Sequence, residues 1–195
     1  MDKELQEIKK SLREMMQLDF IAPEEIPDID LYMEQLTRFM DEHLGNNLRT
    51  EDDKVLTKAM INNYTKNHLL PAPTKKKYSR DHLILLIYIY YMKNVISIGD
   101  IQKLIDPLKN DMDSDKLFEL YKKTFEMEKP QYFNIESSVA KAAQITDKKI
   151  PKEEDEYLNK IIFIFLLGYD IFSKNRLIEK LIDELSEEEK DDQCK

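Results

Sequence analysis

Residues 56–108 of this chain read LTKAMINNYTKNHLLPAPTKKKYSRDHLILLIYIYYMKNVISIGDIQKLIDPL. The stretch contains a short segment with helical periodicity, a basic loop bounded by prolines, a very apolar segment, and a fourth segment that opens with Ser97. Thr57 is a typical N-cap residue, so the first segment predicts a helix from residue 57 to about residue 67. Together the four segments predict a helical unit interrupted by one extended loop.

The first predicted helix has two different faces. The helical period places four apolar side chains on one side, where they must face a core: Leu56, Met60, Ile61 and Tyr64. The other side carries two cations, an amide and a hydroxyl: Lys58, Asn62, Thr65 and Lys66. Side chains of these kinds can contact phosphates and base edges in the major groove of DNA.

A basic loop follows this helix. Pro71 and Pro73 exclude helix there, because each proline also pushes the residue before it out of the α region. The triplet Lys75, Lys76 and Lys77 comes next. Such a triplet is either a solvated turn or, beside a basic helix face, the wing of a winged helix.

Two further helices are predicted after the loop. Every residue from 83 to 92 is apolar or aromatic, so that helix must be buried on nearly every side. It is too short to span a bilayer, which requires ~20 such residues. Ser97, with Asp100 three positions later, predicts the capped start of the next helix. That helix has an apolar stripe of Ile98, Ile101, Leu104, Ile105 and Leu108.

The charge distribution separates this region from the rest of the chain. Residues 54–93 contain eight Lys or Arg and one acid, Asp81, for a local charge of +7, whereas the whole chain carries −9. The acidic remainder already supplies solubility. A basic region within an acidic protein therefore indicates attraction to a polyanion.

At these residues the chain resembles the DNA-binding domain of MerR-type transcriptional regulators. That family has a recognition helix ending in a Tyr pair, then Gly-Leu-Leu-x-Pro, then a basic wing closing on Tyr-Ser, and two more helices. Tyr64 matches the second Tyr, residues 67–71 stand in for the Gly-Leu-Leu-Pro segment, and Tyr78 with Ser79 matches the end of the wing. Residues 98–101 are similar to the start of the family's fourth helix.

This sequence also departs from the MerR pattern. Asn63 stands where the first Tyr would be, and Asn62 replaces an Arg. No Gly precedes Leu69 and none lies in the wing. An acidic loop over residues 46–53 replaces the tight turn ahead of the recognition helix.

The resemblance implies a set of DNA contacts. Lys58, Asn62, Asn63 and Lys66 would face the major groove, and one of the two asparagines would bond bidentately to adenine. Lys75, Lys76, Lys77 and Arg80 would hold phosphates. Tyr64 and Tyr78 would each offer a hydroxyl to the DNA backbone, although both could instead pack in the core, which for Tyr64 explains the residue equally well.

The chain is also similar to a family of uncharacterised bacterial proteins, a domain of unknown function that carries the same LTK-MINNY-K stretch. That similarity extends over about residues 27–129. It supplies a relative without an activity.

Composition indicates a mainly α-helical protein. The chain of 195 residues has three Gly and no alternating strand pattern. Its one cysteine, Cys194, excludes internal disulfides and cysteine-based metal sites. The N-terminal sequence has no apolar signal region, so we expect a cytoplasmic protein without a membrane segment.

We expect two domains, residues 1–110 and residues 111–195. The first contains an amphipathic helix over residues 2–18, which either packs on the domain or contacts a second copy. Its winged helix-turn-helix core spans about residues 28–108 and begins with a helix capped by Asp30 and stopped by Gly45 as a C′ residue. The second is an all-α domain for dimerisation or ligand binding, reached through a polar connection at residues 111–115.

Four helices are expected in the C-terminal domain. They cover about residues 117–125, 135–145, 158–172 and 177–185. The third is apolar on every face, which indicates either the centre of a core or a helix shared across a dimer, and Gly168 interrupts it. The acidic residues after 186 are expected to form a frayed, solvated tail.

No motif in the sequence predicts catalysis. His43, His68 and His82 lie in separate elements without metal-ligand spacing, and neither a phosphate loop nor a nucleophile motif is present. We therefore expect no enzyme activity, metal or cofactor. The sequence favours a sequence-specific, homodimeric regulator that binds double-stranded DNA and responds to an unidentified small-molecule or protein effector. The alternative is an adaptor that uses the same scaffold to bind an acidic protein.

Overall fold

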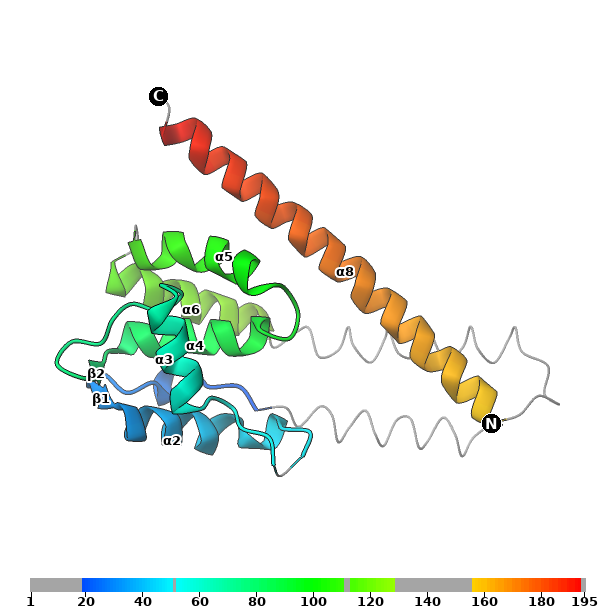
Figure 1. The fold of residues 1–195 in the computed structure, drawn as a ribbon, viewed down its shortest axis with the longest axis horizontal. Coiled ribbons are helices and arrows are strands. Elements are labelled where there is room, and N and C mark those ends of the chain that lie inside the picture. Colours follow the sequence, from blue (N-terminus) through cyan, green and yellow to red (C-terminus); the bar gives the residue numbers. More distant parts are fainter. Residues whose placement is uncertain (1–18, 51, 111–112, 129–155, 194–195) are drawn as a thin grey trace. The chain divides into compact units, whose positions relative to one another are not determined.

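A computed structural model of the protein describes residues 19–50, 52–110, 113–128 and 156–193. This part is mainly helical, with one two-stranded sheet (Figure 1). Its elements are η1 (Pro23–Glu25), β1 (Leu31–Tyr32), α2 (Met33–Leu44), η2 (Gly45–Asn47), α3 (Lys58–Lys66), β2 (Lys77–Tyr78), α4 (Arg80–Met92), α5 (Ile98–Asn110), α6 (Ser114–Glu128) and α8 (Glu156–Gln193). The helices expected over residues 2–18 and 135–145, and Cys194, lie outside the described residues.

The chain divides into two compact units. The first contains η1 through almost all of α6 together with α8 from Ser186 onward, and the second contains α8 as far as Leu185. The domain boundary expected at residue 110 stays a prediction.

The predictions for α3, α4 and α5 are confirmed. The Thr57 hydroxyl accepts a hydrogen bond from the Met60 N–H (3.1 Å), and the Ser97 hydroxyl accepts one from the Asp100 N–H (3.1 Å). These bonds satisfy backbone donors that the first turn of a helix leaves free. Local capping chemistry therefore fixes where α3 and α5 begin.

Helix α4 forms the centre of the first unit, between α5 and α2 in Figure 1. Its residues Leu83–Ile87 and Ile89 are at most 1% exposed. The surrounding helices contribute buried side chains to the same core, among them Leu36, Met40, Ile61, Ile101, Ile105 and Leu117. A short helix without a polar face is stable here because neighbouring elements cover most of its surface.

Residues 31–32 are a strand, so the prediction of a helix capped by Asp30 is wrong at its start. Leu31 pairs with Tyr78 and Tyr32 with Lys77 in an antiparallel register. Helix α2 then begins at Met33, where the Gln35 side chain accepts a hydrogen bond from the Tyr32 N–H (2.9 Å). Pairing of residues 31–32 with the distant strand β2 thus moves the start of the helix away from the predicted N-cap, Asp30.

Helix α2 ends at Leu44, next to Gly45, as predicted, but Gly45 is not in a left-handed conformation. Its φ is −62°, and it opens the short 3-10 turn η2. The polar loop that follows is held by Asn47, whose amide bonds to both backbone groups of Asp19 (2.7 and 2.8 Å).

Helix α8 replaces two predicted helices and the predicted frayed tail. It runs without interruption from Glu156 to Gln193. One glycine in a helix costs about 1 kcal/mol, so Gly168 does not end it. The polar turns beyond Gly168 stay helical with the support of three ion pairs, Asp170–Lys174 (2.6 Å), Arg176–Glu179 (2.7 Å) and Lys180–Glu184 (3.6 Å).

Over the described ranges, no helix combines the length and the apolar character that crossing a membrane requires.

Candidate nucleic-acid interface

The exposed face of α3 carries the side chains that the sequence assigned to it. Lys58, Asn62, Asn63 and Lys66 are all exposed. The opposite face is buried, with Ile61 at 0% and Tyr64 at 6% exposure. The two-faced helix predicted from the sequence is therefore confirmed, except that Met60, expected in the core, and Thr65, expected outside, are each half-buried.

Helix α3 ends in a left-handed turn at His68, whose φ is 59°. The Leu69 N–H bonds to the Tyr64 carbonyl (2.9 Å) and the His68 N–H to the Thr65 carbonyl (3.2 Å). This is the Schellman arrangement, in which glycine is the preferred left-handed residue. His68 adopts that conformation without being glycine, and the Lys109 ammonium bonds to its carbonyl.

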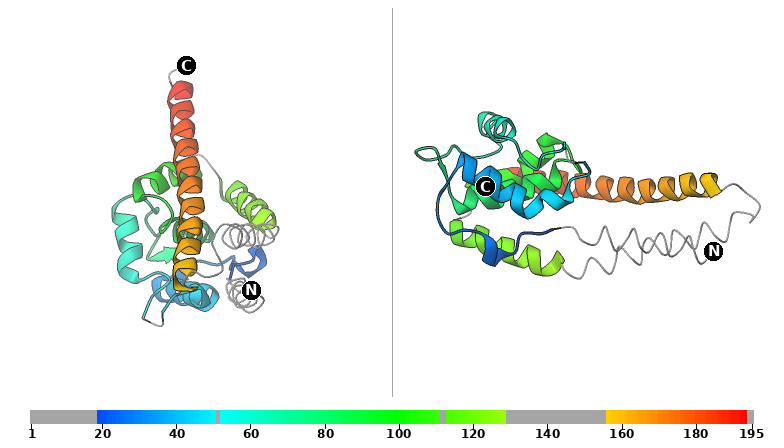
Figure 2. Two further views of the ribbon diagram at one scale, coloured as in Figure 1. Left: turned by 90° about the vertical axis from the view of Figure 1, so that its right-hand side faces the viewer. Right: turned by 90° about the horizontal axis from the view of Figure 1, so that it is seen from below.

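The basic loop is a β-hairpin with lysines at its tip. Thr74 and Lys77 exchange two backbone hydrogen bonds (3.1 and 2.9 Å). The two residues between them, Lys75 and Lys76, have φ values of 51° and 65° and are exposed. Two positive φ values are characteristic of a type I′ turn. The loop projects from the first unit in Figure 1 and in the right view of Figure 2.

The start of α2 connects this hairpin to α3. Tyr32 pairs with Lys77 in the sheet, and the Lys77 ammonium lies 5.3 Å from the centre of the Tyr32 ring. Two residues further on, Glu34 forms an ion pair with Lys58 (2.6 Å). The hairpin and α3 therefore meet at residues 31–34.

Tyr32 and Glu34 were not predicted from the sequence to belong to this surface. Both read as ordinary residues of a helix start, and neither belongs to a motif. Glu34 reaches its partner 24 positions away, a contact that no local pattern encodes. Charge alone would have singled out only the cations.

Tyr64 and Tyr78 belong to the core. Their side chains are 6% and 4% exposed, and burial raises the pKa of both hydroxyls. The Tyr78 ring packs edge-on against His82, with ring centres 5.5 Å apart. Of the two interpretations left open, this burial favours packing, and contacts to DNA remain a prediction.

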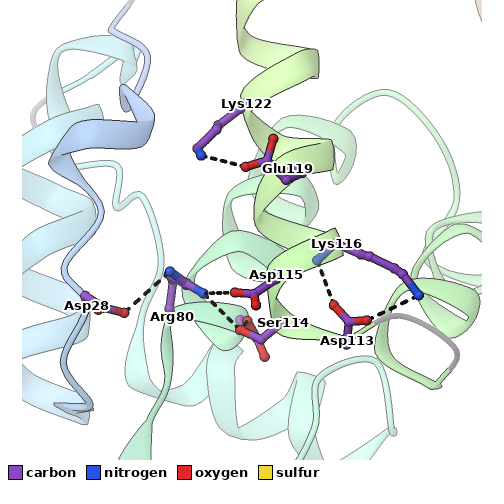
Figure 3. Close-up of polar contacts among 9 residues, drawn as sticks. Asp28, Arg80, Asp113, Ser114, Asp115, Lys116, Glu119 and Lys122 are labelled. Carbon is purple, nitrogen blue, oxygen red and sulfur yellow. Dashed lines mark hydrogen bonds and ion pairs between the residues drawn. The ribbon is translucent and has the colours of Figure 1, made fainter.

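Arg80 lies at a junction with α6 (Figure 3). Its guanidinium forms ion pairs with Asp28 and Asp115, both at 3.5 Å, and donates a hydrogen bond to the Ser114 hydroxyl (3.2 Å). It also stacks on Phe118, 4.5 Å from the ring centre. The predicted phosphate contact would have to compete with these partners for the guanidinium.

His82 fixes the end of the hairpin to the start of α4. Its Nδ1 accepts a hydrogen bond from the Ser79 N–H (3.1 Å) and lies 2.9 Å from the Ser79 hydroxyl. The side chain is 8% exposed, and burial lowers its pKa. The buried imidazole therefore completes the N-terminal cap of α4.

Within the described segments, no group of three or more His, Cys, Asp or Glu side chains is arranged to hold a metal ion. What these segments do contain is a small helical domain with an exposed polar helix beside a lysine-tipped hairpin. The model of the family called Domain of unknown function (DUF1836) matches residues 21–125, so the chain belongs to this family. The match covers η1 through most of α6 and includes every residue of the candidate interface. No curated protein and no solved structure matches the chain.

Proposed function

We propose that the protein is a sequence-specific, DNA-binding transcriptional regulator with a MerR-like winged helix-turn-helix domain. One observation carries this proposal: the exposed polar face of α3 and the hairpin that carries Lys75 and Lys76 are both joined to residues 32–34, α3 through the Lys58–Glu34 ion pair and the hairpin through Lys77 against Tyr32. Helices α2 and α3 would form the helix-turn-helix, and the hairpin would be the wing.

The left-handed residues give independent support. In the MerR pattern, glycine precedes the Leu-Leu-x-Pro segment and also occurs in the wing. His68, Lys75 and Lys76 have positive φ at the corresponding places. The backbone thus has the form that glycine would favour there, although glycine is absent.

The exposed side chains suit both base recognition and phosphate binding by a DNA-binding protein. Amides such as Asn62 and Asn63 can bond bidentately to adenine, and Lys58 can donate to guanine. The exposed lysines of the hairpin can neutralise phosphates, which positions a protein without specifying sequence. We propose that the protein works as a homodimer, since DNA readers of this size commonly bind two half-sites.

A second candidate function is an adaptor that binds an acidic protein through the same face. The chain carries −9 overall, and two of the predicted DNA contacts, Lys58 and Arg80, already form ion pairs with acids. These observations favour a partner less densely charged than DNA.

Fluorescence anisotropy with labelled duplexes tests the proposal. We expect the protein to bind a fragment from upstream of its own coding sequence more tightly than a scrambled duplex, and binding should weaken as salt is raised. Replacing Lys75 and Lys76 by Ala should weaken binding to every sequence. It should also reduce the slope of log affinity against log salt by about 2, because each phosphate contact contributes about 0.9.

Lys103→Ala is the matched control, because it removes an exposed cation from α5, outside the hairpin and α3. It should leave the affinity and the salt slope unchanged. Binding that is weak and equal for all duplexes would refute the proposal. If the hairpin variant then fails to retain a protein partner that the wild type binds, the adaptor function would be favoured instead.

A further inference from the structure

An acidic side chain, Glu34, lies against the exposed face of α3. The Glu34 carboxylate is 2.6 Å from the Lys58 ammonium, and their side chains are 71% and 55% exposed. Most other ion pairs among the described residues join neighbours three or four positions apart on one helix, such as Arg38–Glu42. The Glu34–Lys58 pair instead joins α2 to α3.

Stability does not explain this pair. Ion pairs as exposed as this one contribute little to folding, because water and salt screen them. An ionised carboxylate on a surface that faces phosphates also weakens attraction to DNA. A role in recognition accounts for its position better.

Glu34 is well placed to contact DNA together with Lys58. Lys58 is the first residue of α3, and the N-terminal residues of a recognition helix are those that reach base edges. Glu34 lies in the first turn of α2, where the Thr37 hydroxyl bonds to its carbonyl (3.2 Å). The hydrogen bond from Lys58 lowers the pKa of the Glu34 carboxyl, so this group is an acceptor at neutral pH.

The pair offers donors and an acceptor side by side. A lysine ammonium has three N–H donors, and the bond to Glu34 uses one of them. Across the major groove, a G·C pair presents two acceptors, N7 and O6 of guanine, followed by one donor, N4 of cytosine. An A·T pair instead presents acceptor, donor, acceptor, which would set the adenine N6–H₂ against the ammonium.

We propose that Glu34 and Lys58 together select a G·C base pair, with Lys58 donating to guanine N7 and O6 and Glu34 accepting from cytosine N4. This inference rests on the proposed DNA-binding function. It assigns Glu34 a role in determining which base pair is bound. The charge of Glu34 alone would suggest only repulsion of DNA.

The test begins with a duplex selected by the wild-type protein from a randomised pool. Each base pair of that duplex is then changed singly, and the affinities of wild type and Glu34→Gln are compared by anisotropy. The wild type should discriminate roughly 10-fold or more at one G·C position of each half-site, and the variant should lose this preference while keeping the others. Replacing that guanine by 7-deazaguanine should weaken wild-type binding but leave Lys58→Met, which has no donor, unaffected.

Glu42→Gln is the matched control. It makes the same change of charge at an exposed position on the same helix, and it should leave every base preference intact. Equal tightening of Glu34→Gln on all duplexes, with preferences unchanged, would show that the carboxylate only screens Lys58 and would overturn the inference. Binding to DNA without any base preference in the wild type would overturn it as well. Absence of all DNA binding would instead refute the proposed function itself.

Discussion

Three residues of the candidate interface have a left-handed backbone conformation, which is unfavourable for residues with a side chain: His68, Lys75 and Lys76. A left-handed conformation costs an ordinary residue roughly 1–2 kcal/mol. Each position is held by bonds around it, the Schellman bonds at His68 and the pair between Thr74 and Lys77 at the lysines. Strain kept at exposed residues suggests a functional reason, and for the lysines that reason is charge at the hairpin tip.

His82 is another residue whose side chain supports the backbone next to the hairpin. Burial, the main cause, lowers its pKa, while the backbone of Ala72 and the carboxylates of Asp81 and Asp30 act in the opposite direction. Its Nδ1 accepts the Ser79 N–H, which requires that nitrogen to be unprotonated. Protonation of the imidazole would therefore break the cap of α4.

We predict that His82 makes the protein less stable in mild acid. Because the folded pKa is lowered, the unfolded chain binds the proton more readily once the pH falls below about 6.5. The stability that the neutral imidazole contributes is present above this pH and is lost as the pH falls through the lowered folded value. Urea unfolding at pH 8 and at pH 5 measures the loss. His82→Gln, whose amide oxygen can still accept the Ser79 N–H, should lose less; an equal loss in both proteins would refute the prediction.

At the scale of the element, the sequence predicted what local chemistry determines. Helices α3, α4 and α5 were predicted from two local signals. Thr57 and Ser97 are N-cap residues, and the spacing and number of apolar side chains in each segment indicate which faces are buried. The strand β1 was missed, since two residues carry no periodicity and their pairing partner lies more than 40 positions away. The uninterrupted α8 was missed because Gly168 and the polar turns after it resemble a boundary.

The same difference between local and long-range determinants applies to the candidate site. The outward face of α3 and the lysine hairpin were predicted because they are contiguous in sequence. The contacts Tyr32–Lys77 and Glu34–Lys58 were not, because they depend on how α2 packs beside two other elements. The ion pairs of Arg80 were missed for the same reason, since Asp28 and Asp115 come from opposite ends of the first unit's sequence.

The hairpin allows stability and binding to be separated. Replacing Lys75 by Asn and Lys76 by Gly installs the pair that type I′ turns prefer, so we predict a gain of about 1–2 kcal/mol in unfolding free energy. The same variant should bind DNA more weakly, because two exposed cations are lost. Urea unfolding and anisotropy measure the two effects, and the Lys75→Ala, Lys76→Ala protein controls for charge without relieving the turn. A variant that is more stable and binds as tightly as the wild type would exclude the hairpin from the interface.

At the scale of the whole molecule, charge acts differently at long and short range. The chain carries −9, whereas residues 54–93 carry +7. Electrostatic attraction extends over about 30 Å at 0.01 M salt but only about 8 Å at physiological salt. At low salt, distant DNA is therefore repelled by the net negative charge of the whole protein. The basic face attracts the DNA only when the two molecules are close together.

This division predicts unusual binding kinetics for a DNA-binding protein. A basic protein is steered to DNA by its net charge, so its association slows sharply as salt is added. Here the association rate constant should change by at most about threefold between about 0.01 M and 0.15 M salt, because screening removes long-range repulsion together with local attraction. The dissociation rate constant should rise steeply over the same range, since it reflects the phosphate contacts themselves. Stopped-flow anisotropy measures both constants.

Replacing Glu187 and Glu188, which are exposed on α8, by Gln should speed association at low salt and leave dissociation unchanged. A wild-type association rate that falls tenfold or more with salt would mean that the basic face alone controls the encounter and that the acidic remainder has no influence on it.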